Sequence, residues 1–534
     1  MNRDLTSTQL DYAKFLPATS TFYATFVGKQ RYMNYVDPSR IPPSFTNGME
    51  SLNFLDPVKG QFYYQWCLYS AGHANLDLSK VSWREDMFRN RNRSNSWVLG
   101  DSGGFQIGKG RWEGNWKDPN CPKASKKRKQ VLEWMDTLMD YGMVLDIPSW
   151  IGNFNEAVAK TKIEDFDDAV AGTHINNEYF IRNRNGNCKF LNVLQGENHP
   201  EADRWYDQMK KYSDPKQYPN EHFNGWAMGG QNMCDIHLVL KRLVDLRFDN
   251  LLEPRYQDWM HFLGTSKLEW AVLLTDIQRA VRKYHNPNFT ISYDCASPFL
   301  ATANGQIYYQ TETIDRSKWT YRMSAGLDDK RYKTDTRLYR DVVVNSGVLP
   351  CFENSPIMDQ IKANDICVYG PGDKNKFGKS NKTSWDSFSY GIMMAHNIWH
   401  HINAVQEANR QYDNGLCPAM LVKEKIDRIY FRDIVNAIFS TSNRAVADNI
   451  VDDFGFFYDQ VIGTRGASGK RATSAGPKFH ELFDFVGQSS VKSNLDDDDL
   501  ESDEEVEIVD EIDFTEEQYD RLEELELENE DDLT

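Results

Sequence analysis

The sequence predicts an α/β protein whose core is a closed (β/α)8 TIM barrel. Three observations predict it: short β-rich segments recur every thirty to fifty residues, amphipathic segments separate them, and most of the β-rich segments end at a glycine or a polar residue. Strands that alternate with helices form parallel sheets. In a closed barrel the C-terminal ends of all strands meet at one mouth, whereas an open sheet has a ligand site only at the single point where the strand order reverses. Because many successive segments end at a polar residue or glycine, the closed barrel explains the pattern better.

The segments that predict strands are SWVLGD (96–101), GMVLDIP (142–148), KFLNVLQG (189–196), GWAMGG (225–230), MHFLGTS (260–266) and FTISYDCASP (289–298). The helical segments between them carry apolar residues at i, i+3, i+4 and i+7: KKRKQVLEWMDTLMDYG (126–142), PEADRWYDQMKKY (200–212), MCDIHLVLKRLVDLRF (233–248) and KLEWAVLLTDIQRAVRKY (267–284). The order along the chain is therefore strand, helix, strand, helix.

Four regions follow from this pattern. Residues 1–95 are aromatic and proline-rich, and we expect an N-terminal cap that supplies the first barrel elements. Residues 96–345 form the catalytic barrel core. Residues 346–485 form a C-terminal helical region, because SYGIMMAHNIWHHINAVQEANR and KEKIDRIYFRDIVNAIF have helical periodicity. Residues 486–534 form a disordered acidic tail.

The formal net charge of −18 is concentrated at the C-terminus. Residues 495–534 contain 22 acidic residues and one arginine, and the remaining chain has a net charge of +3. Such a block repels itself and predicts disorder. It is either a solubilising tail or a polyanion mimic that competes for a basic groove or docks a protein partner.

Composition also predicts the compartment. We find no apolar run long enough for a membrane span and no apolar stretch typical of a signal peptide, so we expect a cytoplasmic protein without a membrane partner, in a host-cell cytoplasm if it is viral. The eight cysteines are scattered, without a C-x-x-C pair, which favours reduced packing residues.

The stretch VLGDSGGFQIGKG (98–110) has two interpretations. From Gly103 it approaches a phosphate-binding loop, G-x-x-x-x-G-K-[ST], but Gly110 stands where Ser or Thr is needed, and glycine and prolines follow where a helix must begin. The second interpretation places Asp101 at the end of a strand, with Gly103 and Gly104 letting the backbone approach a flat ligand. The second interpretation is favoured.

Two other aspartates end apolar segments in the same way, Asp294 in FTISYD and Asp146 in MVLD. Two carboxylates at one mouth are the minimum for displacement at an anomeric carbon, one as nucleophile and the other moving protons. Asp146 can accept hydrogen bonds from the N–H edge of a purine. Any one of the three can instead be a helix cap or turn residue, but that explanation is weaker for all three together.

Five short motifs carry a resemblance to a known family: DSGGFQ (101–106), VLQG (193–196), AMGG (227–230), FLG (262–264) and DCASPFLATANG (294–305). In this order and spacing they resemble the tRNA-guanine transglycosylase superfamily, over roughly residues 95–310, with a weaker echo at SYGIMMAHN (389–397). The resemblance implies a barrel enzyme that removes guanine from a polynucleotide and installs a 7-deazaguanine.

The resemblance also implies roles for individual residues. Asp294 would be the nucleophile that attacks C1′ and forms a covalent glycosyl-enzyme intermediate, and Asp101 would bind the base and act as general acid and base. The remaining residues would contact the base, with Phe105 and Leu263 stacking on its two faces and the others reading its edge: Asp146, Gln195, Gly229 and Gly230. The chemistry itself needs no cofactor.

A structural zinc ion is a further expectation of the resemblance. His396 stands where the family has a zinc-binding histidine, but the upstream cysteines are only Cys351 and Cys367, far apart in sequence. Zinc requires about four ligands, so His400, Cys417 or a carboxylate would have to complete the site. The alternative is a helix packed directly where the metal would lie.

Other positions depart from the tRNA branch of the family. Leu300 and Ala303 stand where tRNA enzymes carry two arginines that grip the RNA backbone, and Gln231 follows the paired glycines where a small apolar residue is common. These departures favour the DNA-modifying paralogues of bacteriophages and bacterial modification clusters, whose 7-deazaguanines serve in restriction evasion. We therefore expect a DNA-guanine transglycosylase that uses a preQ0-like base.

Three alternatives remain open: a tRNA enzyme with an altered grip, a non-catalytic nucleic-acid-binding paralogue, and a plain barrel glycoside hydrolase. Binding a polyanion requires cationic surface. Two basic segments flank the DSGG strand, RNRNRSN (89–95) and KASKKRKQ (123–130), although each can also be a solvated face. The second segment supplies the candidate nucleic-acid contacts Lys126, Lys127, Arg128 and Lys129.

Overall fold

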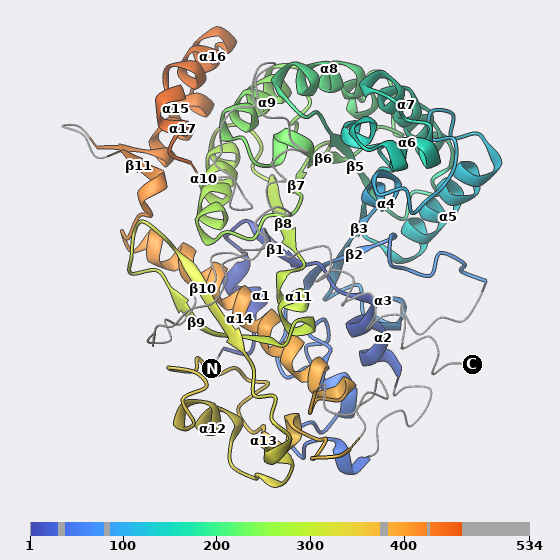
Figure 1. Ribbon diagram of the computed structural model, residues 1–534. Helices are drawn as coiled ribbons and strands as arrows, with labels where there is room; N and C mark the ends of the chain where they lie inside the picture. The colour runs from blue at the N-terminus through green and yellow to red at the C-terminus, as the bar shows by residue number, and fades with distance from the viewer. Residues whose placement is uncertain (1, 30–37, 80–85, 374–382, 424–427, 462–534) are drawn as a thin grey trace, which may run out of the picture.

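A computed structural model describes residues 2–29, 38–79, 86–373, 383–423 and 428–461 of the chain. Its centre is an eight-stranded parallel sheet, ringed by helices, in the order β1-β8-β7-β6-β5-β4-β3-β2 (Figure 1). The predicted α/β barrel is confirmed. Its strands are β1 (Lys14–Pro17), β2 (Trp66–Ser70), β3 (Trp97–Asp101), β4 (Tyr141–Met143), β5 (Lys189–Leu194), β6 (Gly225–Met228), β7 (Trp259–Phe262) and β8 (Thr290–Cys295).

The ends of the sheet meet between β1 and β2. Directly after β1, Ala18 forms a parallel bridge with Leu68 of β2, and the N–H of Thr19 donates to the carbonyl of Leu68 at 2.9 Å. On its other side β1 pairs with β8, with Leu16 opposite Asp294. The barrel therefore closes through residues that precede position 96.

Helices follow the strands and cover the outside of the barrel (Figure 1). The longer helices between the strands are amphipathic and bury their apolar residues: α5, α7, α8, α9 and α10. The helices of the N-terminal and barrel regions are α1 (Leu5–Gln9), α2 (Thr21–Lys29), α3 (Asp86–Arg89), α4 (Gly104–Gly108), α5 (Pro122–Leu138), α6 (Asn155–Thr161), α7 (Phe166–Asn183), α8 (His199–Met209), α9 (Ile236–Phe248), α10 (Leu268–Tyr284) and α11 (Ser297–Ala303).

After β8 the chain forms an antiparallel hairpin of β9 (Gln306–Glu312) and β10 (Thr320–Ala325), which is separate from the barrel sheet. The barrel strands thus run from β1 to β8, so that the first two lie within residues 1–95 and the last ends well before residue 345. The remaining elements are α12 (Tyr339–Asn345), α13 (Ala363–Ile366), α14 (Ser387–Asp413), β11 (Val422–Lys423), β12 (Ile429–Tyr430), α15 (Phe431–Ser440), α16 (Arg444–Asp453) and α17 (Gly455–Tyr458).

Helix α14 completes the wall beside β1. It packs against α10 and α11, and the ring of His401 stacks on Phe15 of β1 with centroids 4.4 Å apart. Its Gln406 side chain donates to the carbonyl of Leu5 in α1 at 2.7 Å. The C-terminal helical region is therefore part of the barrel's support. The predicted tail, residues 486–534, lies outside the described residues.

Aromatic rings fill the floor of the barrel, at the N-terminal ends of the strands. Trp97 of β3 and Trp259 of β7 stack with centroids 4.1 Å apart, and Tyr141 of β4 lies 5.4 Å from each. The buried Lys14 of β1 donates to the carbonyls of Gln9, Leu10 and Tyr12 at 2.8, 2.5 and 3.1 Å. No helix in the described part of the chain has the length and apolar character that a membrane span requires.

Candidate active site

The three predicted aspartates gather at the mouth, at the C-terminal ends of the strands. Asp101 is the last residue of β3, Asp294 is the penultimate residue of β8, and Asp146 lies three residues after β4. The three carboxylates lie close enough to affect one another. In addition to burial, the negative charge of Asp294 raises the pKa of Asp101, and that of Asp101 raises the pKa of Asp146. Residues nearly two hundred positions apart therefore form one carboxylate cluster.

Asp101 is held by the neighbouring strand. Ser70, its register partner on β2, donates its hydroxyl to Asp101 Oδ2 at 2.5 Å. Burial raises the pKa of Asp101, the hydrogen bond from Ser70 lowers it, and the negative charge of Asp294 raises it; the net shift is upward from the ordinary value. A carboxyl whose pKa is moved toward neutral pH is suited to proton transfer.

Asp294 accepts two hydrogen bonds on the same oxygen. The backbone N–H of Gly264 lies 2.9 Å from Oδ1, and His261 Nε2 lies 3.1 Å from it. No described residue hydrogen-bonds to Oδ2, and the Asp294 side chain is 14% exposed. The carboxylate is thus fixed in orientation while one oxygen stays available to a ligand at the mouth.

Asp146 and Gln195 form a buried polar pair. Gln195 Nε2 donates to Asp146 Oδ2 at 2.8 Å, which leaves Gln195 Oε1 buried without a hydrogen-bond partner among the described residues. Burial raises the pKa of Asp146 to about 7, the hydrogen bond from Gln195 opposes that rise, and the charge of Asp101 adds to it. An unmatched amide oxygen beside a perturbed carboxyl is the kind of polar surface that a ligand satisfies.

Glycines bring the backbone close to this pair. A Cβ at Gly229 would lie 2.8 Å from Gln195 Nε2, and a Cβ at Gly104 would lie 3.1 Å from Asp146 Oδ1. Gly230 has φ +53°, and a Cβ there would collide with the Gly196 carbonyl. Gly230 therefore has room for no larger residue, and a side chain at Gly229 or Gly104 would press on Gln195 or Asp146.

Apolar side chains lie at the rim of the mouth. Phe105, on α4, is 54% exposed, and its ring centroid lies 6.0 Å from that of Trp150. Trp150 and the partly buried Leu263 both pack against Met233 and Cys234. The two predicted stacking residues therefore belong to one apolar rim, with Trp150 between them.

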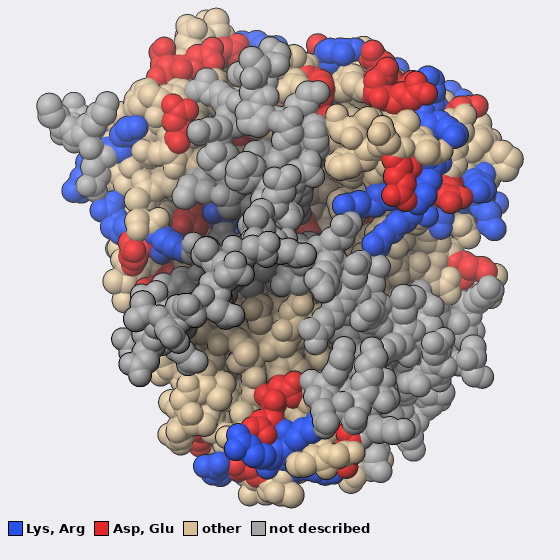
Figure 2. All heavy atoms as spheres, viewed as in Figure 1, with Lys and Arg blue, Asp and Glu red and all other residues tan. Residues whose placement is uncertain are grey.

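The basic segment 123–130 forms the start of α5, beside the mouth. Lys127 Nζ lies 4.7 Å from the ring of Trp112, and a Cβ on Gly103 would lie 2.6 Å from that same ring. Lys126 and Lys129 are exposed, and Lys129 pairs with Glu133 at 3.7 Å. Lysine and arginine side chains gather over α4, α5 and α6 among acidic ones (Figure 2).

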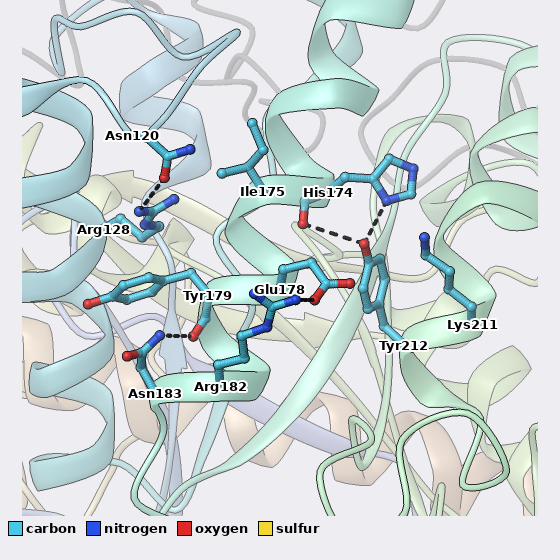
Figure 3. Close-up of a pocket in the computed structure, with 10 residues that line it drawn as sticks. All are labelled: Asn120, Arg128, His174, Ile175, Glu178, Tyr179, Arg182, Asn183, Lys211 and Tyr212. Carbon is cyan, nitrogen blue, oxygen red and sulfur yellow. Dashed lines mark hydrogen bonds and ion pairs between the residues drawn. The ribbon is translucent and has the colours of Figure 1, made fainter.

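Arg128 differs from the predicted nucleic-acid contact, because it is buried. Its guanidinium lies 4.1 Å from the ring of Tyr179 on α7, and Nη2 donates to Asn120 Oδ1 at 3.2 Å. It borders a cavity of about 470 Å³ between α5, α7 and the 3-10 turn η5 (Lys210–Ser213), which none of the three aspartates lines (Figure 3). Arg128 holds helices together instead of facing a polyanion.

The other basic segment, residues 89–95, lies at the opposite end of the barrel. It precedes β3, and Arg91 forms an ion pair with Asp140, which precedes β4, at 2.5 Å. The Arg91 side chain is 1% exposed. The segment therefore flanks β3, as predicted, but at the N-terminal end of the strand and away from the mouth.

The three predicted zinc ligands are engaged elsewhere. His396 is fully buried, with Nδ1 2.8 Å from Ser355 Oγ and Nε2 2.8 Å from the Tyr308 carbonyl. Cys351 Sγ lies 3.5 Å from Gln310 Oε1, and Cys367 Sγ lies 3.2 Å from the Leu327 carbonyl. Among the described residues no three His, Cys, Asp or Glu side chains form a group that could hold a metal ion. A zinc ion stays a prediction.

The sequence did not point to three residues of the site: Ser70, His261 and Trp150. Ser70 ends the short strand β2, which was not predicted, and His261 lies in β7, which was. Along a strand every second side chain points into the barrel. That alternation was a usable signal for His261, which stands three residues before the glycine of FLG. No family model matches the chain, and the search of curated proteins found no match.

Proposed function

We propose that the protein is a DNA-guanine transglycosylase that exchanges guanine for a 7-deazaguanine base through a covalent aspartyl intermediate. The observation that carries this proposal is the coupled carboxylate cluster, in which Asp294 and Asp101 share one mouth with the Asp146–Gln195 pair. Two carboxylates alone fit any retaining glycosidase. The buried amide and carboxyl pair beside glycine backbone adds a surface suited to a purine edge.

The reaction would proceed by two displacements at C1′. In the first, an oxygen of Asp294 bonds to C1′ and the C1′–N9 bond breaks, with its electron pair leaving on guanine, which takes a proton from Asp101. In the second, Asp101 accepts the N9 proton of the incoming base, N9 bonds to C1′, and the bond to Asp294 breaks. Two inversions retain the configuration. The raised pKa of Asp101 suits a group that must both give and take this proton.

The base would lie between the apolar rim and the glycine backbone. Asp146 would accept N–H groups of the purine edge, and the backbone N–H of Gly230 would face its carbonyl oxygen. Phe105 and Leu263 would contact its faces, with Trp150 closing the rim between them. A base in a duplex must be flipped out of the stack to reach such a mouth.

DNA is proposed over tRNA because of the helix after the nucleophile. Leu300 and Ala303, at the positions where tRNA enzymes carry arginines, are 1% and 0% exposed in α11. They cannot contact a phosphate backbone. Lys126 and Lys127, near the mouth on α5, are better placed to contact phosphates.

Exchange of radiolabelled guanine or 7-deazaguanine into duplex DNA, compared with bulk tRNA, tests the proposal. We expect incorporation into DNA by the unaltered protein and none by Asp294→Ala. Incorporation into tRNA alone would support a tRNA enzyme instead. The absence of exchange into either nucleic acid would support a non-catalytic paralogue.

A further inference from the structure

A chain of buried hydrogen bonds leads from the barrel floor to Asp294. Trp259 Nε1 donates to Ser292 Oγ at 2.8 Å, Ser292 Oγ lies 2.8 Å from His261 Nδ1, and His261 Nε2 lies 3.1 Å from Asp294 Oδ1. His261 and Ser292 are both fully buried. Their positions follow from strand alternation, because Trp259 and His261 on β7 and Ser292 and Asp294 on β8 point into the barrel.

The groups at the two ends of this chain, the Trp259 indole and the Asp294 carboxylate, determine which atom donates each hydrogen bond. An indole N–H can only donate, so Ser292 Oγ accepts from Trp259, and a carboxylate can only accept, so His261 Nε2 must carry the proton shared with Asp294. The Ser292 hydroxyl has no other acceptor than His261 Nδ1 among the described residues. The complete chain is satisfied when His261 is neutral, with its proton on Nε2.

We propose that His261 is a positioning residue that selects which oxygen of Asp294 reacts. As the neutral Nε2–H tautomer it donates to Oδ1 together with the Gly264 N–H, and this leaves Oδ2 to form the bond to C1′. The proposal rests on the transglycosylase function for the reaction, but the protonation of His261 does not depend on it.

The two donors have a different effect on each half of the reaction. When Oδ2 bonds to C1′, Asp294 becomes a neutral ester and its hydrogen bonds to Oδ1 weaken. When the C1′–Oδ2 bond breaks, the electron pair returns to the carboxylate, and His261 and Gly264 stabilise the charge that develops there. Loss of the His261 donor should therefore slow release of the intermediate more than its formation.

Half-reactions on the full-length protein measure this asymmetry. Release of labelled guanine from DNA reports formation of the intermediate, and a chase with 7-deazaguanine reports its breakdown. We expect His261→Leu to slow breakdown by about 100-fold, the usual cost of one lost donor to a developing anion, with formation slowed far less, so that the covalent adduct accumulates. His261→Gln, whose amide can donate to Oδ1, should restore most of the breakdown rate.

Two further variants separate positioning from general damage. Ser292→Ala removes the hydroxyl that accepts from the Trp259 indole and donates to His261 Nδ1. It should slow breakdown of the intermediate more than its formation, but by less than His261→Leu does. His222→Leu changes a buried histidine that precedes β6, at the floor end of the barrel, and should leave both rates unchanged. Equal slowing of both half-reactions by His261→Leu in a folded protein, or failure of His261→Gln to restore breakdown, would overturn the proposal.

The tautomer is measured without any reaction. Nitrogen-15 NMR of histidine-labelled protein, with His261→Gln identifying the resonances, should show a protonated Nε2 and an unprotonated Nδ1. A proton on Nδ1, alone or in an imidazolium, would overturn the proposed chain. If the unaltered protein exchanges no base, the transglycosylase function fails, while this spectrum still decides the protonation of His261.

Discussion

The floor and the mouth of the barrel are built from the same eight strands, yet they differ in how their polar groups are satisfied. At the floor, Lys14 donates to three carbonyls, and Trp97 and Trp259 stack. At the mouth, Asp101 and Asp146 have raised pKa values, and Gln195 Oε1 has no partner among the described residues. The floor stabilises the fold, and the mouth keeps unfavourable groups that a ligand can satisfy.

The cost of burial at the mouth can be judged from Asp146. Raising its pKa to about 7 disfavours the charged form by about 4 kcal/mol relative to an ordinary aspartate, a large share of the stability of a typical domain. Burial shifts the pKa of Lys14 at the floor by a comparable amount, but three carbonyls accept from Lys14, whereas Gln195 Oε1 beside Asp146 has no partner among the described residues. Substitutions at the two ends should therefore separate activity from stability.

The largest effect is expected at the proposed nucleophile, Asp294. Asp294→Ala should lower base exchange by about 10,000-fold or more, as removal of a covalent nucleophile does, while the free energy of unfolding stays within about 1 kcal/mol of the unaltered protein. Exchange assays and urea denaturation together measure this separation. A large loss of stability would show that the carboxylate belongs to the structural part of the barrel.

The opposite result is expected at the floor. Trp97→Ala should lower the free energy of unfolding by about 3 kcal/mol, because it removes a large, partly buried ring from the stack with Trp259. Exchange by the folded protein at low temperature should fall far less than in Asp294→Ala, because Trp97 reaches Asp294 only through Trp259 and the Ser292–His261 chain. Comparable losses of activity and stability would show that the two ends are not independent.

A smaller effect is expected from pH at the base-binding pair. Asp146 must be ionised to accept the N–H groups of the base, and its pKa of about 7 leaves it largely protonated in the empty site below neutral pH. The KM for the base should therefore fall by up to about tenfold per pH unit as the pH rises toward 7, and level off above it. Asp146→Asn should raise the KM for the base and remove its dependence on pH. If KM of the variant depended on pH as in the unaltered protein, the titrating group would be another residue, such as Asp101.

The smallest effect is expected from Lys14. Burial lowers its pKa to about 7, below that of an unfolded lysine near 10.4. Between these values the unfolded chain binds the extra proton, so the stability that the neutral folded form contributes grows as the pH rises from 7 to 10. Lys14→Met should lower this slope by up to about 1.4 kcal/mol per pH unit. Urea denaturation at pH 7.5 and 9.5 measures it, and identical slopes would contradict the shifted pKa.

The sequence predicted the barrel because β3 to β8 end in visible turn and polar residues. The predicted strand 96–101 corresponds to β3, and FTISYD corresponds to β8, so the places of Asp101 and Asp294 were predictable. The strands β1 and β2 were not, because KFLP contains lysine and proline and both strands lie in the aromatic, proline-rich segment 1–95. Ser70, at the end of β2, was missed with them.

The remaining residues depend on tertiary contacts that no local pattern reports. Arg128 is buried only because α7 places Tyr179 against it. His261 gains its meaning from Ser292 and Asp294 on the adjacent strand. The hairpin of β9 and β10 was also missed, since the buried residues of β9 are consecutive and do not alternate with polar ones, and β9 is supported by α14.

The stacked rings of Trp97 and Trp259 have a consequence for the order of events in the proposed reaction. Because the floor is closed, the mouth is both entrance and exit, and the displaced guanine must depart before the new base can enter. This predicts ping-pong kinetics, in which guanine and the incoming base compete for the same covalent form of the enzyme. Accumulated guanine would then reverse the first step, so that modification would run to completion only where free guanine is kept scarce.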